Sequence, residues 1–354
     1  MEMKPLGVLL VLVLVGSLVI VLTALLAVEP TTAQQFSDWS PPTNLNAIVL
    51  SDGTPCPAVV NSAYNDQHPT ISKDGLSLIF TSDRPGGSGA QDLWVTERAS
   101  PDGCWGEPKN LGLIVNSPVN DGAPNLTTDG HWMYFHSRRK EGSCNGGVSA
   151  ELWVTRRRDA RDNFGWEKPI NLGCTINMAG FFQNGPTHFE DETGTQSLYF
   201  TRLPTGASED FYAVYVSICS ADLATCNTQG LWGPGERVDA LNVPPDPLHN
   251  FGRTTRTAIR RRDNLEMIIS SKRMGGVGTM IELWTSTRAT TLDQNWSKPK
   301  NLTVLNTSAA NTGAPALSWD GTELYFYSNR TDLPGAHTGV NDLYVSKRTK
   351  LTTP

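Results

Sequence analysis

The feature that most constrains this 354-residue chain is internal repetition, because five segments carry the same signals in the same order. The best preserved copies combine a proline, an Asp-Gly turn, Phe-x-Ser-x-Arg, an acidic residue before Leu-Trp, and Trp-x-x-Pro-x-Asn-Leu. The prolines Pro69 and Pro124 lie 55 residues apart, and Pro186 and Pro315 repeat the pattern. Alternating apolar residues around Asp-Gly turns, repeated at this spacing, predict four-stranded propeller blades whose first strand follows the proline.

The ends of the chain predict how the ring closes. After Tyr344 the fifth copy lacks its Trp…Pro-x-Asn-Leu element, and that element occurs instead between Trp39 and Leu45. The N-terminal segment should therefore supply the fourth strand of the blade whose other strands come from the C-terminus. Closure of this kind removes the open edges of a sheet. The sequence thus predicts an all-β, five-bladed β-propeller over residues 34–354.

The pattern Pro…Ser-x-Asp-Gly…Phe-x-Ser-x-Arg…Asp-Leu-Trp resembles the WD-like propeller repeat of TolB-type proteins and other exported bacterial proteins. The resemblance covers roughly residues 36–348. It implies a propeller that binds a ligand, docks a protein partner or acts on carbohydrate. The five copies differ from the blade number of TolB itself, so the resemblance does not imply the role of TolB.

The N-terminus predicts export. Lys4 precedes an uncharged apolar run over residues 6–28, which is long enough to cross a bilayer. Residues 1–33 are interpreted either as an uncleaved membrane anchor or as a signal peptide cleaved before Gln34. Both alternatives place the propeller in the cell envelope, on the periplasmic or extracellular side. Six cysteines suit an oxidising compartment, and Cys219 and Cys226 are close enough in sequence to form a disulfide.

The charge distribution limits the partners. A formal net charge of -6 argues against nucleic acid. Two basic runs fall in turns opposite the predicted ligand site, and they are expected either to contact anionic lipid or to be solvated. These runs comprise Arg156, Arg157, Arg158, Arg260, Arg261 and Arg262.

Charged residues that recur in every blade are predicted to be structural. An arginine ends the second strand of each unit, and an acidic residue begins the third strand of four units. Guanidinium and carboxylate groups form paired hydrogen bonds, so an ion pair across each blade is expected. The arginines are Arg84, Arg139, Arg202, Arg273 and Arg330, and the acids are Asp92, Glu151, Glu282 and Asp342. The repeated tryptophans are likewise predicted to pack the blades.

Residues that differ between copies are better candidates for function. The segments that enter the first strands form a polar ring at the predicted mouth of the central channel. This ring could bind a sugar, a peptide or a cation, or its amides and carboxylates could simply cap turns. Its members are Asn65, Asp66, His68, Asn120, Asp121, Asn184, His249, Asn250 and Asn311.

These patterns favour a non-catalytic binding or scaffolding propeller that recognises a glycan or a protein partner at its mouth. The alternative is a carbohydrate-active enzyme, a glycoside hydrolase or lyase, with Asp66 and Asp121 as catalytic carboxylates. A third interpretation is a structural component of an envelope assembly. The six histidines show no close-spaced pair of metal ligands, and no nucleotide fingerprint occurs, so no metal or cofactor is expected.

Overall fold

The computed structural model describes residues 35–246, 251–291 and 295–351. Residues 36–350 form one compact unit. The apolar segment 6–28 lies outside the described residues, as do His249 and Asn250. Within the described ranges, no helix has the length and apolar character needed to span a membrane.

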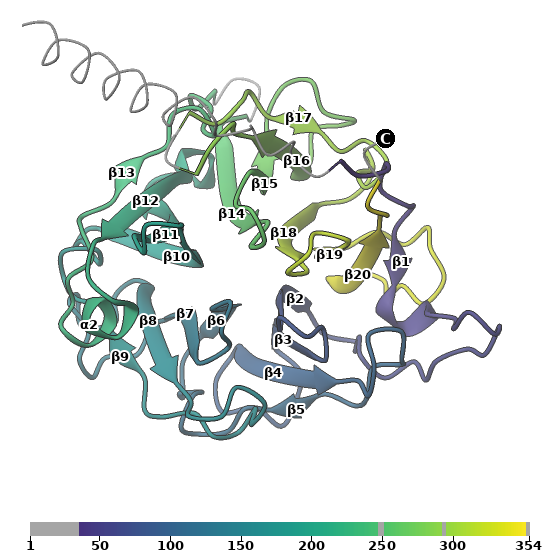
Figure 1. The fold of residues 1–354 in the computed structure, drawn as a ribbon, viewed down its shortest axis with the longest axis horizontal. Coiled ribbons are helices and arrows are strands. Elements are labelled where there is room, and N and C mark those ends of the chain that lie inside the picture. Colours follow the sequence, from purple (N-terminus) through teal and green to yellow (C-terminus); the bar gives the residue numbers. More distant parts are fainter. Residues whose placement is uncertain (1–34, 247–250, 292–294, 352–354) are drawn as a thin grey trace, which may run out of the picture. The chain divides into compact units, whose positions relative to one another are not determined.

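The compact unit contains five four-stranded antiparallel sheets arranged around a central channel (Figure 1). The first blade comprises β2 (Asp66–Ile71), β3 (Ser77–Ser82), β4 (Asp92–Glu97) and β5 (Lys109–Asn110). The second comprises β6 (Asp121–Leu126), β7 (Trp132–Ser137), β8 (Glu151–Arg156) and β9 (Ile170–Asn171). The third comprises β10 (Phe181–Glu190), β11 (Gln196–Pro204), β12 (Ala213–Cys219) and β13 (Glu236–Arg237).

The fourth blade comprises β14 (Arg253–Ile259), β15 (Glu266–Lys272), β16 (Glu282–Thr287) and β17 (Lys300–Asn301). The fifth combines β18 (Thr312–Leu317), β19 (Glu323–Ser328) and β20 (Asp342–Lys347) with β1 (Thr43–Asn44). In that blade Thr43 pairs with Val345, and Asn44 pairs with Tyr344. The predicted five-bladed fold and its closure by an N-terminal strand are therefore confirmed.

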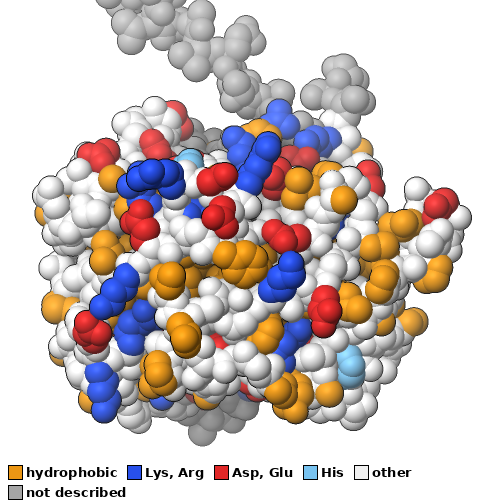
Figure 2. Space-filling model, turned by 90° about the horizontal axis from the view of Figure 1, so that it is seen from below, with side chains coloured by type: hydrophobic (Ala, Val, Ile, Leu, Met, Phe, Trp, Pro, Cys, Tyr) orange, Lys and Arg blue, Asp and Glu red, His pale blue; other side chains and the backbone are white. Residues whose placement is uncertain are grey.

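One arginine of each basic run is buried and already paired inside the protein. Arg157 is completely buried and donates hydrogen bonds to the Gly130 carbonyl and to Asn163. Arg260 is buried in ion pairs with Asp263 and Glu266. The predicted lipid contact is therefore wrong for these two arginines, because their charges are already used inside the protein. On the side of the ring that Figure 2 shows, acidic and basic side chains are interspersed.

The repeated tryptophans pack between blades. All five are at most 7% exposed, so none offers a free platform for stacking a sugar: Trp39, Trp105, Trp166, Trp232 and Trp296. Trp105 meets Tyr325 edge-on with ring centroids 6.2 Å apart, and Trp232 meets Tyr134 at the same distance. Each of these contacts joins two neighbouring blades, and such edge-to-face pairs add to the free energy of burial.

A buried asparagine completes the outer edge of each blade. Its side-chain amide accepts a hydrogen bond from a backbone N–H of the third strand and donates one to the carbonyl of the same residue. The five pairs are Asn61–Leu343, Asn116–Leu93, Asn177–Leu152, Asn242–Val214 and Asn306–Leu283. These contacts explain why the outer strands are short. The asparagine side chain makes the hydrogen bonds to the third strand that the backbone of a longer outer strand would make.

Replacing Asn177 with aspartate is expected to lower the free energy of unfolding by about 2 kcal/mol, since it leaves a buried carbonyl without its donor. Asn177 Nδ2 lies 3.0 Å from the Leu152 carbonyl and 2.9 Å from Asn171 Oδ1, and aspartate cannot donate either bond. Urea denaturation of the variant measures the effect. A loss below about 0.5 kcal/mol, which is typical of surface substitutions, would show that this side chain does not secure the strand.

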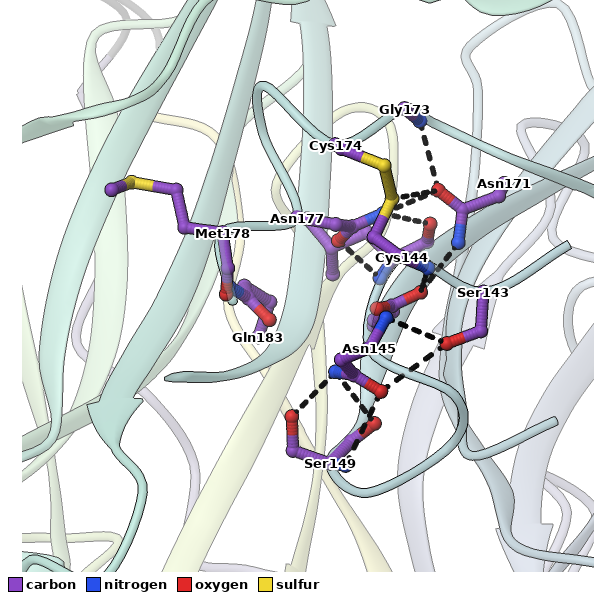
Figure 3. Close-up of a disulfide and its surroundings, with 12 residues drawn as sticks. Ser143, Cys144, Asn145, Ser149, Asn171, Gly173, Cys174, Asn177, Met178 and Gln183 are labelled. Atoms are coloured by element: carbon purple, nitrogen blue, oxygen red, sulfur yellow. Dashed lines mark hydrogen bonds between the residues drawn. A yellow bond between two sulfur atoms is a disulfide. The ribbon is translucent and has the colours of Figure 1, made fainter. Parts of the chain in front are cut away.

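Three disulfides join the described cysteines, and none of these cysteines is free. Cys56 is bonded to Cys104, and Cys219 at the end of β12 is bonded to Cys226 in the short helix α2 (Leu223–Thr228). The sequence does not predict this helix. Cys144 and Cys174 join the loop between β7 and β8 to the segment that follows β9, beside Asn171 and Asn177 (Figure 3). A cross-link over 30 residues contributes about 3.6 kcal/mol of stability.

Candidate active site at the channel mouth

The five inner strands β2, β6, β10, β14 and β18 each contain a β-bulge near the mouth. In four of them the repeat proline lies inside the bulge, so the strand begins before this proline and does not follow it as predicted. A proline has no N–H to donate, so it fits a bulge, where one backbone hydrogen bond between the strands is missing.

One bulge residue of each inner strand adopts a left-handed backbone conformation. The five residues and their φ angles are His68 (53°), Ala123 (52°), Gly185 (60°), Arg256 (47°) and Ala314 (49°). Three of these residues are small. At the other two positions, a large side chain is held in a conformation that costs on the order of 1 kcal/mol for a residue other than glycine. Strain of this kind at His68 and Arg256 points to a functional role.

One position of the second strand also differs between blades. It directly follows the recurring apolar residue of that strand, which is Phe80, Phe135, Phe200, Ile269 or Phe326. Thr81, Thr201 and Ser270 are small, and their hydroxyl groups accept hydrogen bonds from bulge N–H groups of the next blade. At the same position the second and fifth blades carry His136 and Tyr327. Each large ring lies over a glycine of the inner strand.

The glycines beneath the two rings are required for space. A Cβ atom on Gly122 would lie 3.0 Å from the His136 ring, and one on Gly313 would lie 3.0 Å from the Tyr327 hydroxyl. Tyr327 also packs edge-on against His68, with ring centroids 5.9 Å apart. Four large side chains from four blades thus replace small ones around the mouth.

Several polar atoms around this mouth are buried and have no hydrogen-bond partner. Buried polar groups are nearly always paired in folded proteins, so a cluster of exceptions indicates a place where a ligand supplies the partners. The atoms are Nδ1 of His68, Nδ1 of His136, Oδ1 of Asn184, Nε of Arg253 and Nη1 of Arg256. Asn184 Nδ2 donates to the Tyr212 hydroxyl at 3.3 Å, which fixes the amide in place.

The electrostatics keep both imidazoles neutral. Burial, reinforced by the charge of Arg256, lowers the pKa of His68 and of His136 well below the ordinary value. Burial also lowers the pKa of Arg256 to about 10, so this guanidinium keeps its charge at neutral pH. Among the described residues, Glu209 is the carboxylate that acts on this cluster, and it forms an ion pair with Arg253. Within the described ranges, Arg256 therefore has a charge without a paired carboxylate.

The channel below the mouth is narrow. A cavity of about 20 Å³ is lined by His68, Arg256 and the bulge prolines, which is room for about one water molecule. A ligand larger than a water molecule therefore cannot pass through the ring at the bulges.

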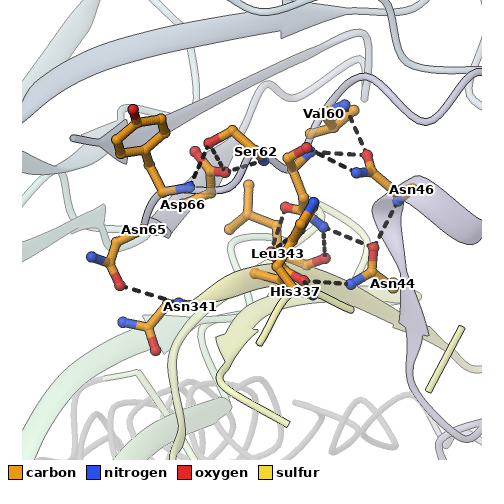
Figure 4. Close-up of polar contacts among 12 residues, drawn as sticks. Asn44, Asn46, Val60, Ser62, Asn65, Asp66, His337, Asn341 and Leu343 are labelled. Atoms are coloured by element: carbon orange, nitrogen blue, oxygen red, sulfur yellow. Dashed lines mark hydrogen bonds and ion pairs between the residues drawn. The ribbon is translucent and has the colours of Figure 1, made fainter. Parts of the chain in front are cut away.

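Asp66 and Asp121 do not face the channel. Both are completely buried. Asp66 accepts hydrogen bonds from the backbone and hydroxyl of Ser62, at 2.6 and 2.8 Å (Figure 4). It also pairs with Arg84 at 2.5 Å. Asp121 makes the same contacts with Ser117 and Arg139. Their proposed catalytic role is wrong on this geometry, because each carboxylate is enclosed by its own blade.

Some of the other residues predicted at the mouth lie there, and others do not. His68 and Asn184 lie at the mouth. Asn65 and Asn311 instead form turn contacts with Asp83 and Asn329, and the carbonyl of Asn120 accepts the Arg138 N–H. These contacts of Asn65 and Asn311 favour the turn interpretation, and ligand binding by any of the three asparagines stays a prediction.

The expected ion pairs between the repeated arginines and the third-strand acids do not form. Arg84 and Arg139 pair instead with Asp66 and Asp121, and the other three arginines bind carbonyl or hydroxyl oxygens. The acids accept hydrogen bonds from backbone N–H groups of the preceding loop and from an asparagine of the fourth strand. This description applies to Asp92, Glu151, Glu282 and Asp342.

Four mouth residues were missed by the sequence reasoning: His136, Arg253, Arg256 and Tyr327. Two features of the sequence could have identified His136, Tyr327 and Arg256. The variable position of Phe-x-Ser holds His136 and Tyr327 where other units have Thr or Ser, and Arg256 lies in the only repeat unit without the proline.

Larger cavities lie elsewhere. A groove of about 690 Å³ lies between the first and fifth blades, near the turns that join β2 to β3 and β18 to β19, at the end of the inner strands opposite the mouth. Four of its five cations form ion pairs: Arg98 and Lys347 with Glu323, Lys350 with Asp320, and Arg348 with Glu266. The fifth, Lys73, lies over the Trp319 ring. Size alone therefore does not make it the functional site. Within the described ranges, no group of three or more His, Cys, Asp or Glu side chains could hold a metal ion.

No family model and no curated protein matches the sequence. Solved structures do match the fold. An α-L-arabinofuranosidase from Lactobacillus brevis is 16% identical with a TM-score of 0.55, and the match covers 86% of this chain and 95% of that chain. A thermostable family-43 glycoside hydrolase is 13% identical with a TM-score of 0.53, over 87% and 94% of the two chains. A GH62 hydrolase in complex with xylotriose is 10% identical with a TM-score of 0.54, over 89% and 99%.

These similarities establish a fold shared with glycoside hydrolase propellers, and the expected relationship to TolB-type repeat proteins is wrong. The interpretation as a non-catalytic binding or scaffolding propeller is corrected with it, because the matching structures are glycoside hydrolases.

Proposed function

We propose that the protein is a carbohydrate-active enzyme that binds a glycan at the channel mouth and cleaves it by proton transfer through His68, His136 and Tyr327. The observation that carries this proposal is the pair of neutral imidazoles with unpartnered Nδ1 atoms beside Arg256. A neutral imidazole accepts a proton, and a phenol donates one, which are the two functions that glycosidic cleavage requires. The fold shared with glycoside hydrolases supports the choice of glycan as substrate.

We further propose that the enzyme works outside the cytoplasm, in the cell envelope. Its three disulfides support this location, because disulfides persist in oxidising compartments. The apolar segment 6–28 favours export, either as an anchor or as a signal peptide.

Replacing His136 with glutamine is expected to reduce glycan cleavage by about 100-fold while the protein stays folded, because general acid–base groups contribute this much or more. The assay incubates the protein with a panel of neutral and acidic polysaccharides and measures new reducing ends. His131→Gln is the matched control, since His131 lies in the same blade just before β7 and contacts the Arg157 carbonyl. A panel without turnover, or equal activity of His136→Gln and the parent protein, would contradict the proposed function.

A further inference from the structure

We infer that the mouth recognises a uronic acid residue of its glycan and cleaves the chain beside it by β-elimination. This inference rests on the proposed function and specifies its substrate and reaction. It starts from the charge of Arg256, which the described structure leaves without a paired carboxylate.

The fold holds Arg256 at the mouth by several separate means. Its backbone N–H donates to Thr201 Oγ1 at 3.2 Å, and its φ of 47° fixes the residue in the bulge. A Cβ atom at position 185 would lie 2.5 Å from its guanidinium, so Gly185 provides the space that this side chain occupies. A desolvated cation is costly unless an anion compensates it. The arrangement therefore fits a ligand that brings the negative charge.

The neighbouring atoms specify the form of this anion. Nη1 of Arg256 and Nε of Arg253 are unpartnered donors, and a planar guanidinium suits a carboxylate. Oδ1 of Asn184 is an unpartnered acceptor suited to a sugar hydroxyl. Together these groups match a sugar that bears both a carboxylate and hydroxyl groups.

The same charge selects the reaction. Hydrolysis of a glycosidic bond passes through a cationic, oxocarbenium-like transition state that a pair of carboxylates normally stabilises. The described mouth has an unpaired arginine instead, and its positive charge opposes that transition state. In β-elimination the charge that develops is negative and accumulates on the substrate carboxylate, where an arginine stabilises it.

The steps of the elimination balance within the site. A neutral imidazole, of His68 or His136, removes the proton from the ring carbon that bears the carboxylate. The electron pair forms a double bond to the neighbouring ring carbon, and the bond from that carbon to the glycosidic oxygen breaks. The Tyr327 hydroxyl protonates the departing oxygen, and solvent then returns both side chains to their starting states. No water, oxidant or reductant is consumed.

The binding arm of the test compares oligogalacturonate, a neutral galactan oligosaccharide and a sulfated galactan oligosaccharide by calorimetry on the full chain. The parent protein is expected to prefer the uronate. Arg256→Asn is expected to lose about 10- to 100-fold in uronate affinity, with little change for the neutral sugar; asparagine tolerates the left-handed conformation. Arg262→Gln is the control, because Arg262 is exposed. Equal binding of neutral and acidic sugars, equal or tighter binding of the sulfated sugar, or unchanged affinity in Arg256→Asn, overturns the inference.

The turnover arm separates this inference from the proposed function. Elimination yields an unsaturated uronate that absorbs ultraviolet light, with one such product for each new reducing end. Reducing ends without this absorbance would mean hydrolysis, which overturns the elimination and leaves the carbohydrate-active function standing. Uronate binding that depends on Arg256 without any turnover would support the recognition site and overturn the proposed enzyme.

Discussion

Replacing Asp121 with asparagine is expected to lower the free energy of unfolding by about 4 kcal/mol, because the change leaves a charged arginine without its buried partner. The Asp121 carboxylate is fully buried, and Oδ1 lies 2.7 Å from the Arg139 guanidinium. Its other oxygen accepts two hydrogen bonds from Ser117 at 2.6 Å, and an amide cannot accept all of these bonds. Urea denaturation followed by tryptophan fluorescence measures the loss.

The control for this prediction is Asp239→Asn. Asp239 also pairs with an arginine, Arg237, but its side chain is 81% exposed, and exposed ion pairs contribute less than about 1 kcal/mol. If Asp121→Asn unfolded like the parent protein but lost glycan cleavage, Asp121 would act in catalysis and the structural assignment would fail.

Stability is expected to fall as the pH drops from 6.5 towards 4, and His188 accounts for part of this fall. Burial lowers the pKa of His188 from 6.5 to about 4. The ring stacks on Tyr134 at 5.5 Å, and its Nε2 lies 2.9 Å from Gln196 Oε1. Below pH 6.5 the unfolded chain binds a proton at this residue while the folded protein does not, so acid favours unfolding.

One pKa unit corresponds to about 1.4 kcal/mol, so His188 alone contributes about 3 kcal/mol of destabilisation at pH 4. His68 and His136 act in the same direction, because burial lowers their pKa values as well. The measurement is urea denaturation between pH 4 and pH 7, for the parent protein and for His188→Gln. The variant should show a smaller loss over this range, since glutamine does not titrate. An unchanged pH dependence in the variant would mean that His188 is protonated in the folded protein.

The blades and their closure could be predicted because they depend on local signals. Each turn, strand and tryptophan lies within one repeat unit, and the displaced Trp39–Leu45 element shows where the ring joins. Four of the five buried asparagines were visible in the same way, as an asparagine that follows an Asn-Leu pair; Asn242 has no such pair before it. Every blade needs its strands, its tryptophan and its buried asparagine, so these features recur in all five repeat units.

The mouth could be predicted only in part: His68 and Asn184 were expected there, whereas His136, Arg256 and Tyr327 were not. His68, His136, Arg256 and Tyr327 belong to four different blades, and only the closed ring brings them together. Asp66 and Asp121 illustrate the opposite error. Each starts an inner strand, which suggests an inward side chain, yet the carboxylates turn back to Ser62 and Ser117. Sequence position gives the strand but not the direction in which its first side chain points.

The short pairing of β1 with β20 has a consequence for how the protein folds during synthesis. Thr43 and Val345 pair although they are 302 positions apart in the chain, and contacts at such separation form slowly. β1 is the first strand to be synthesised, and it has no partner strand until β20 has been made. The Cys56–Cys104 cross-link needs only residues of the first blade and its preceding segment. It can therefore hold the waiting segment near its final place before the C-terminal blade exists.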